Sequence, residues 1–152
     1  YSEFDLHLFP KTGLIKRKTM ASNSEYEQKY NILMIEISIN GVRGNALLDT
    51  GTFYTSIDKD LARISGTKIH EQTDIFFSDA AGNKSYASIM RADSIKIANY
   101  TLSQNKFYPV FENLDRTGTK HEMSYICVIG MDLLTQNNAV IDFGNKKLYL
   151  VK

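Results

Sequence analysis

The sequence predicts an all-β protein that folds as one domain. Several segments alternate apolar and polar residues with a period of two, as strands with one buried face do. Turn residues separate these segments at short intervals, and few segments carry a helical pattern. The chain has 152 residues with no repeat and no internal linker, which is the size of a single domain. Its hydrophobic fraction of 43% supplies enough apolar surface for a core.

The N-terminal residues are expected to lie at the periphery. Residues 4–9 alternate weakly like a strand, which Pro10 is expected to end. The basic residues 16–18 are interpreted as a solvated turn, with a localisation signal as the alternative. We therefore predict an N-terminal extension or linker over residues 1–29 and the folded domain over residues 30–152.

A β-hairpin is the clearest local prediction. Residues 35–39 alternate with period two, and residues 42–48 form the return strand. Between them stands Asn40-Gly41, a pair that tolerates the positive φ angles of a type I′ turn. The return strand leads directly into Asp49-Thr50-Gly51.

The remaining elements follow from the same patterns. A short helix is predicted over residues 58–64, with Asp58 as its cap, and a second over residues 131–135. Asp132 is interpreted as a helix-start cap and Asp142 as part of a surface turn. The predicted strands are 68–77, 84–97, 101–111, 125–129, 139–143 and 147–151, and residues 112–123 are a predicted surface loop.

Charge and composition exclude several classes of partner. Lys and Arg number 18 against 17 Asp and Glu, so the net charge is +1 and nothing favours nucleic acid. No run approaches the ~20 apolar residues that a membrane-spanning helix needs. Because the chain begins with Tyr1, a signal peptide or anchor is expected to be missing from it. An exported, periplasmic or membrane-anchored protein is favoured on that ground, and the compartment is otherwise unknown.

No metal and no organic cofactor is expected. His7 and His70 are isolated, and His121-Glu122 lacks the second histidine of a zinc protease because position 125 is Tyr125. The single cysteine, Cys127, lies in an apolar segment and is interpreted as a core residue rather than a nucleophile. The motifs of serine hydrolases and of nucleotide-binding loops are absent from the sequence.

Asp49-Thr50-Gly51 is the motif with the clearest chemistry. It follows the apolar residues 46–48, so its carboxylate stands at the end of a buried strand. A carboxylate there is costly unless it is hydrogen-bonded or paired. Small neighbours let main-chain N–H groups approach its oxygens. Taken alone, the tripeptide also fits an ordinary turn or a helix cap, so its context decides.

Two later motifs supply that context. V-I-G-M-D-L-L occupies residues 128–134, and A-V-I-D-F occupies residues 139–143. With the hairpin and L-L-D-T-G-T, these motifs make the chain resemble the retropepsin-like aspartic proteases, the single-domain relatives of pepsin, from about residue 30 to the C-terminus. The resemblance implies a closed barrel with one or two short helices, and aspartic endopeptidase activity.

The resemblance also implies roles for individual residues. Asp49 is the catalytic acid, and Thr50 braces the two catalytic loops of a dimer. Gly51 and Thr52 orient the carboxylates, while Val128-Ile129-Gly130 passes behind the loop.

A substrate-binding flap, a hairpin that closes over the substrate, is implied for residues 78–84. The residues that we assign to it are Asp79, Ala80, Ala81 and Gly82, which include small residues that let the flap backbone approach a peptide. The neighbouring aromatic residues Phe76, Phe77 and Tyr86 either line substrate pockets or fill the barrel.

One such loop is half of a catalytic site. Hydrolysis by this route needs two carboxyl groups that share a proton. Asp142-Phe143-Gly144 breaks the D-[ST]-G pattern and no other copy exists, so a homodimer must supply the second Asp49. The substrate would be an extended peptide or protein segment held between flap and dyad. Thr52 stands where retroviral members have alanine, and its hydroxyl would favour the charged carboxylate, which predicts an acidic to mildly acidic pH optimum.

Two alternatives remain open at this point. The chain could be a catalytically silent module that keeps the fold for dimerisation or peptide binding. It could also be a protease held inactive as a monomer, with residues 1–29 as a masking segment rather than a linker. The intact Asp49-Thr50-Gly51 argues against the silent module, because a purely structural module has no need of a buried acid pair.

Overall fold

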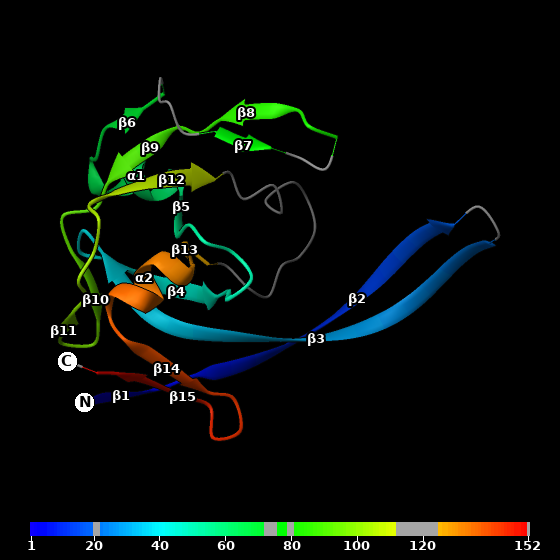
Figure 1. Cartoon of the computed structure of the whole chain (residues 1–152), viewed down its shortest axis with the longest axis horizontal. Helices are drawn as coiled ribbons and strands as arrows, with labels where there is room; N and C mark the ends of the chain where they lie inside the picture. The colour runs from blue at the N-terminus through cyan, green and yellow to red at the C-terminus, as the bar shows by residue number, and fades with distance from the viewer. Residues whose placement is uncertain (20–21, 72–75, 79–80, 112–124, 152) are drawn as a thin grey trace.

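The computed structural model describes residues 1–19, 22–71, 76–78, 81–111 and 125–151. Within these residues the chain forms fifteen strands and two short helices, which confirms the predominantly β architecture (Figure 1). The predicted loop over residues 112–123 lies outside the described residues, as does His121-Glu122.

Ten strands form the main sheet. In spatial order it contains β11 (Tyr100–Thr101), β10 (Ile95–Ile97), β3 (Ser22–Ile39), β4 (Val42–Leu48), β13 (Cys127–Ile129), β5 (Ser56–Asp58), β12 (Phe107–Phe111), β9 (Ile89–Arg91) and β6 (Ile69–His70), and β2 (His7–Thr19) pairs with β3 outside this order. The pairs β4–β13 and β5–β12 are parallel, and the other pairs are antiparallel. The predicted strand segments 68–77, 84–97 and 101–111 are thus each broken into shorter strands.

The closed barrel that the resemblance implies is not formed by the described strands. Closure requires pairing between the two edge strands of a sheet. Here β11 pairs with β10 and β6 pairs with β9, and each of these edge strands is only two residues long. The main sheet is therefore an open, curved sheet within the part of the chain that the structure describes.

The predicted hairpin is confirmed at β3 and β4. Ile39 pairs with Val42, and the two turn residues Asn40 and Gly41 have φ angles of 50° and 81°. The Asn40 side chain also accepts a hydrogen bond from the main-chain N–H of Asp93 at 2.7 Å. This contact ties the turn to the connection between β9 and β10.

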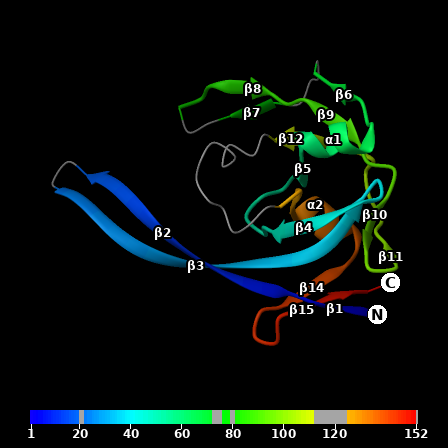
Figure 2. The ribbon, with the colours of Figure 1, turned by 180° about the vertical axis from the view of Figure 1, so that it is seen from behind.

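A long second hairpin departs from the sequence prediction. Strand β2 runs through Pro10 and through residues 16–18, and it pairs with β3 over thirteen positions. Pro10 therefore does not end the strand, and residues 16–18 are strand rather than turn. Among the described strands β2 pairs with β3 alone, and a proline without an N–H is tolerated in such an edge strand. We call residues 9–19 and 22–32 the arm, and Figures 1 and 2 show it projecting away from the rest of the fold.

A separate three-stranded sheet joins the two ends of the chain. Strand β1 (Ser2–Asp5) pairs with β15 (Lys147–Leu150), which also pairs with β14 (Ala139–Asp142). Lys147 Nζ lies 2.9 Å from a carboxylate oxygen of Glu3 and 2.5 Å from one of Asp5. The domain boundary predicted at residue 30 stays a prediction, although β1 from the first 29 residues takes part in this sheet.

Both predicted helices are present. Helix α1 (Lys59–Ser65) begins after Asp58, whose side chain accepts a hydrogen bond from Asp60 N at 3.0 Å, so the predicted cap is confirmed. The helix ends at Gly66, with a φ of 70°. Helix α2 (Met131–Gln136) begins after Gly130 and carries the buried residues Leu133 and Leu134.

The core is apolar and continuous. Its fully buried side chains come from the main sheet, from both helices and from β15: Ile37, Ile39, Ile57, Leu61, Met90, Ile95, Tyr108, Ile129, Leu133, Leu148 and Leu150. Cys127 is also fully buried, and burial raises the pKa of its thiol well above the usual range. The interpretation of Cys127 as a core residue is confirmed, because a deeply buried thiol that holds its proton is inert.

The described residues contain neither a helix suited to span a membrane nor a cluster of metal ligands. None of the helices there has the length and apolar character needed to cross a membrane. The same residues contain no group of three His, Cys, Asp or Glu side chains placed to hold a metal ion.

Candidate active site

Asp49 lies where β4 leaves the core. Strand β4 is held on one edge by β3 and on the other by β13, and Ala46 within it is fully buried. The main-chain N–H of Asp49 donates to Ile129 O at 3.0 Å, so β13 holds the strand up to this residue. The side chains of Asp49 and Thr50 are exposed. The carboxylate is therefore carried to the surface by a rigid strand.

The turn after Asp49 is fixed by its own carboxylate. Gly51 N donates to Asp49 Oδ1 at 2.9 Å, and Thr52 N donates to Asp49 O at 3.4 Å. Aspartate side chains often form turns of this type with the main chain two residues on. A Cβ atom at position 51 would lie only 3.1 Å from Asp49 Oδ1 and would crowd the carboxylate. Glycine at this position lets the carboxylate lie close to the main chain. The contact between Thr52 and Asp49 in this structure is a main-chain one.

Helix α2 supports the loop from behind. Met131 N donates to Thr52 O and Asp132 N donates to Phe53 O, both at 2.9 Å. A Cβ atom at Gly130 would lie 2.7 Å from the carbonyl carbon of Tyr54, so position 130 has no room for a side chain. The segment V-I-G thus lies directly behind the D-T-G loop, where the resemblance puts it.

Asp132 forms a buried network that the sequence analysis missed. Its Oδ1 accepts hydrogen bonds from Thr55 N at 2.9 Å, from Thr55 Oγ1 at 2.6 Å and from Leu133 N at 2.6 Å. Thr55 Oγ1 in turn accepts from Gly130 N at 3.0 Å. The interpretation of Asp132 as a helix-start cap was wrong, because Gly130 holds that position and Asp132 lies in the first turn.

The signal for this network was present in the sequence but non-local. Thr55 follows the D-T-G motif and Asp132 belongs to V-I-G-M-D, and the two residues are 77 positions apart. Both motifs were recognised separately. Pairing Thr55 with Asp132 required knowing that β13 lies beside β4, which no local pattern indicates.

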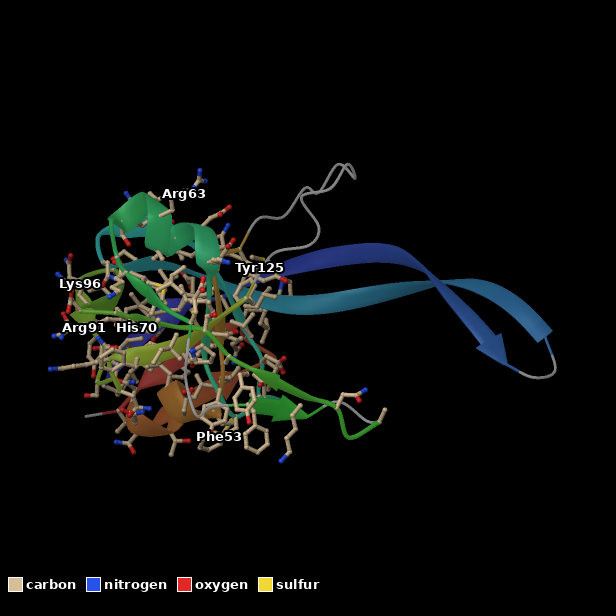
Figure 3. All side chains as sticks on the ribbon, turned by 90° about the horizontal axis from the view of Figure 1, so that it is seen from above. Phe53, Arg63, His70, Arg91, Lys96 and Tyr125 are labelled. Atoms are coloured by element: carbon tan, nitrogen blue, oxygen red, sulfur yellow. The ribbon has the colours of Figure 1, made fainter. Side chains whose placement is uncertain are left out.

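Two exposed aromatic side chains follow the D-T-G loop and were also missed. Phe53 is 64% exposed and Tyr54 is 47% exposed, and their rings meet edge to face with centroids 4.9 Å apart. Figure 3 shows Phe53 at the surface of the body, on the side from which the hairpin of β7 (Phe76–Ser78) and β8 (Lys84–Tyr86) projects. Large apolar side chains held at a surface by a fixed backbone are suited to contact a ligand or a partner.

A hairpin stands where the flap is expected. Strand β7 (Phe76–Ser78) pairs with β8 (Lys84–Tyr86), and the two form a sheet of their own. Phe76 and Tyr86 are 47% and 65% exposed with rings 6.1 Å apart, so these two do not fill the core. Gly82 has a φ of 83°, and Ala81 and Gly82 are exposed. The expected flap residues Asp79 and Ala80 lie outside the described residues.

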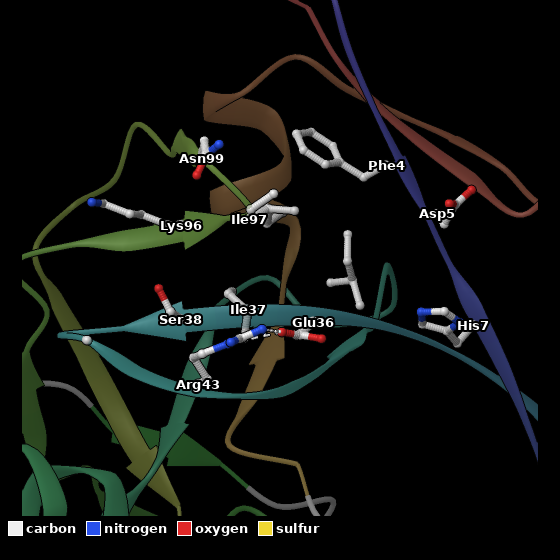
Figure 4. Close-up of a pocket in the computed structure, with 13 residues that line it drawn as sticks. Phe4, Asp5, His7, Glu36, Ile37, Ser38, Arg43, Lys96, Ile97 and Asn99 are labelled. Atoms are coloured by element: carbon white, nitrogen blue, oxygen red, sulfur yellow. Dashed lines mark hydrogen bonds and ion pairs between the residues drawn. The ribbon is translucent and has the colours of Figure 1, made fainter.

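A cavity of about 600 Å³ lies elsewhere in the molecule. It is bordered by β1, by β3 and by β10, and Figure 4 shows the ion pair between Arg43 and Glu36 at its wall. His7 and Lys96 also line it, but no residue of the loop 49–55 does. The loop that carries Asp49 therefore lies outside this cavity.

The loop presents a single exposed acid. Asp132 behind it is buried and already accepts three hydrogen bonds. Asp142, as expected, belongs to a surface turn, where Asn145 donates to it from N at 2.9 Å and from Nδ2 at 2.8 Å. These hydrogen bonds hold the pKa of Asp142 below its ordinary value. Neither carboxylate is arranged as a second member of an acid pair with Asp49.

Comparison with solved structures gives the same fold. The retroviral protease-like domain of Ddi1 from Leishmania major is similar with a TM-score of 0.55 and 18% identity, over 80% of this chain and 90% of that one. A retropepsin-like aspartic protease from Rickettsia conorii is similar with a TM-score of 0.50 and 20% identity, over 95% of this chain and 93% of that one. No curated protein sequence matches the chain.

The sequence itself matches a protein-family model. Residues 35–136, about two thirds of the chain, match the family described as "gag-polyprotein putative aspartyl protease". The matched region contains the D-T-G loop, the β7–β8 hairpin and the supporting helix α2. The chain belongs to this family of retropepsin-like aspartyl proteases.

Proposed function

We propose that the chain is an aspartic endopeptidase whose active site is completed by a second copy of itself. The observation that carries the proposal is the exposed Asp49 on a loop that main-chain groups hold in place: Gly51 N and Met131 N donate hydrogen bonds to the loop, and Ile129 O accepts one from Asp49 N. A side chain required only for folding would not need to be exposed at the end of a buried strand. The membership of the family supports the same chemistry.

The second carboxyl group of the reaction would come from Asp49 of the partner. Two carboxyl groups a few ångströms apart cannot both ionise comfortably, so they share one proton. One of them polarises a water molecule for attack on the scissile carbonyl carbon, and the other donates its proton to the carbonyl oxygen. A twofold axis beside the two loops would place the acids at equal height.

The exposure of the loop supports a homodimer. Thr50 is exposed next to Asp49, in the position from which it would brace the partner's loop. The cavity of about 600 Å³ is not lined by Asp49, and the substrate groove is proposed to form only when two chains meet.

The substrate would be an extended peptide or protein segment. Its main chain would lie between the dyad and the β7–β8 hairpin, which we propose as the flap, with Asp79, Ala80, Ala81 and Gly82 at its tip. The exposed rings of Phe53 and Tyr54 stand beside the catalytic loop and are placed to contact the peptide or the partner. The proposed reaction uses no metal and no organic cofactor.

A cleavage assay on a peptide library at several pH values tests the proposal. We expect cleavage with an acidic to mildly acidic optimum, and a decrease in kcat of about a thousandfold or more for Asp49→Asn, since the acid and base roles are both removed. Asp142→Asn is the matched control, because it neutralises a partly exposed aspartate outside the loop and should keep its turn.

The outcomes separate the candidate functions. Cleavage that persists in Asp49→Asn would refute Asp49 as the catalytic acid. A folded, dimeric chain that cleaves no peptide at any pH would favour the silent binding module instead. Thr52→Ala should move the pH–rate profile, because a hydroxyl beside the dyad favours its charged form.

A further inference from the structure

The arm is a large structural feature that the proposed function leaves unexplained. It consists of residues 9–19 of β2 and residues 22–32 of β3, and it precedes the family match that begins at residue 35. Within the described part of the chain, β2 pairs with no strand other than β3. The arm is therefore a two-stranded ribbon over its whole length.

A two-stranded ribbon of this length is expected to be stabilised by packing against further protein. Eleven residues per strand at ~3.3 Å each give a projection of about 35 Å. Isolated two-stranded hairpins are only marginally stable in water, and packing against further protein is what normally stabilises them. In Figures 1 and 2 the arm projects away from the body of its own chain, which leaves the covering surface to another molecule.

The direction in which the arm projects indicates which molecule covers it. The loop after β4, which carries Asp49, lies at the side of the body from which the arm projects, and the β7–β8 hairpin extends to the same side (Figures 1 and 2). A dimer that brings two Asp49 loops together must place the partner on this side. An arm about 35 Å long that leaves the body there has to run alongside the partner.

The register separates the arm into two sets of positions. Paired residues of an antiparallel ribbon share a face, and alternate pairs share the same face. One set of alternate positions contains Phe9 with Ile32, Lys11 with Tyr30, and Ile15 with Tyr26. The other set contains Thr12 with Lys29, Leu14 with Glu27, and Lys16 with Glu25. The first set is the more apolar and aromatic, and the second carries most of the charge.

We propose that each arm lies along the partner subunit in the homodimer, with the set that contains Ile15 and Tyr26 toward the partner. The occupant of this face is a second copy of the chain, and the inference rests on the proposed dimeric protease. Two arms related by the twofold axis would each pack against the other subunit. These contacts would lower the dissociation constant of the dimer without contributing to the acid dyad.

Shortening the arm in register is the first test. Removing residues 12–19 and 22–29 leaves residues 20 and 21 between Lys11 and Tyr30, which pair with each other in the full chain, so the order of the remaining pairs is kept. We expect the dissociation constant, measured by analytical ultracentrifugation, to rise at least about tenfold, which corresponds to one apolar side chain lost from an interface. Activity per dimer should be retained at high protein concentration. An unchanged dissociation constant would overturn the proposal.

A matched pair of substitutions tests which set of positions is covered. Ile15→Lys and Leu14→Lys make the same change at neighbouring residues that belong to opposite sets. Ile15→Lys should weaken the dimer about tenfold, since a charge would enter the interface, while Leu14→Lys should leave it unchanged. Equal effects of the two substitutions would contradict the assignment of the face.

Amide hydrogen exchange separates failure of this inference from failure of the proposed function. Amides of residues 11–30 should exchange fast in dilute monomer and slowly in the dimer, and Asp49→Asn, although inactive, should show the same protection. A catalytically active dimer whose arm amides exchange as fast as in the monomer would overturn the arm proposal alone. A chain that remains monomeric at every concentration yet cleaves peptides would overturn the proposed dimer as well.

Discussion

Asp132 and Lys147 each join segments that are distant in the sequence, but in opposite surroundings. Asp132 is buried and receives hydrogen bonds from Thr55 and Leu133, so it fixes the loop that carries Asp49. Lys147 is near the surface and contacts Glu3 and Asp5, so it fixes the N-terminal strand to β15.

The contacts of Asp132 and those of Lys147 differ in how strongly they hold their segments in place. A donor left without an acceptor in the core loses its only partner, whereas surface groups exchange one partner for water. Buried hydrogen bonds of this kind hold the loop that carries Asp49, whereas a cluster of charges near the surface holds the terminal sheet. Substitutions in the two regions should therefore differ in size and in their dependence on salt and pH.

The largest effect is expected for Asp132→Ala. It leaves the main-chain N–H and the hydroxyl of Thr55 without their acceptor inside the core. The free energy of unfolding should fall by about 3 kcal/mol, as measured by urea denaturation. Because the loop behind Asp49 is released, kcat should fall as well. Asp132→Asn keeps an acceptor oxygen and should recover part of both losses; a stability equal to wild type for Asp132→Ala would refute the role of the network.

Gly130→Ala is expected to have the next largest effect. The new Cβ atom would lie 2.7 Å from Tyr54 C and 2.8 Å from Phe53 O, and main-chain atoms cannot move aside cheaply. Overpacking of this kind should lower the free energy of unfolding by about 2 kcal/mol and displace the loop.

Gly144→Ala is the matched control for that substitution. At position 144 the nearest atom to a new Cβ is Asp142 Oδ1 at 3.5 Å, an ordinary contact. Thermal unfolding of the two variants compares them directly. Equal melting temperatures would show that the space behind the D-T-G loop is less tightly filled than the structure indicates.

The sequence was sufficient where the structural cause is local. The type I′ turn at Asn40-Gly41 and the cap at Asp58 depend on residues within a few positions, and both were predicted correctly. It was insufficient where the cause lies far along the chain. Pro10 lies inside a strand because residues 22–39 provide a long partner, and no pattern near Pro10 indicates that pairing.

The candidate site divides in the same way. The D-T-G loop could be located from its own residues and from the V-I-G motif. The bond from Thr55 to Asp132 spans 77 positions, and it depends on the parallel pairing of β4 with β13. Phe53 and Tyr54 were missed because exposure is a property of the fold and not of the residue type.

The smallest effect is expected for Lys147→Met, and its pH dependence identifies the cause. Hydrogen bonding to Lys147 holds the pKa of Asp5 below its ordinary value of 3.8, so this contribution to stability is present above that value and is lost as the pH falls through the lowered one. Hydrogen bonding to Asp5 and Glu3 raises the pKa of Lys147 above 10.5, so its contribution is present below 10.5 and is lost as the pH rises through the raised value.

Between these limits the melting temperature of Lys147→Met should lie slightly below that of wild type. The difference should shrink below about pH 4 and near about 1 M salt, where the Debye length is ~3 Å. Lys146→Met, which replaces the exposed neighbouring lysine, should not show this pattern. A difference that is independent of both salt and pH would mean that Lys147 holds β1 through the packing of its aliphatic chain rather than through its charge.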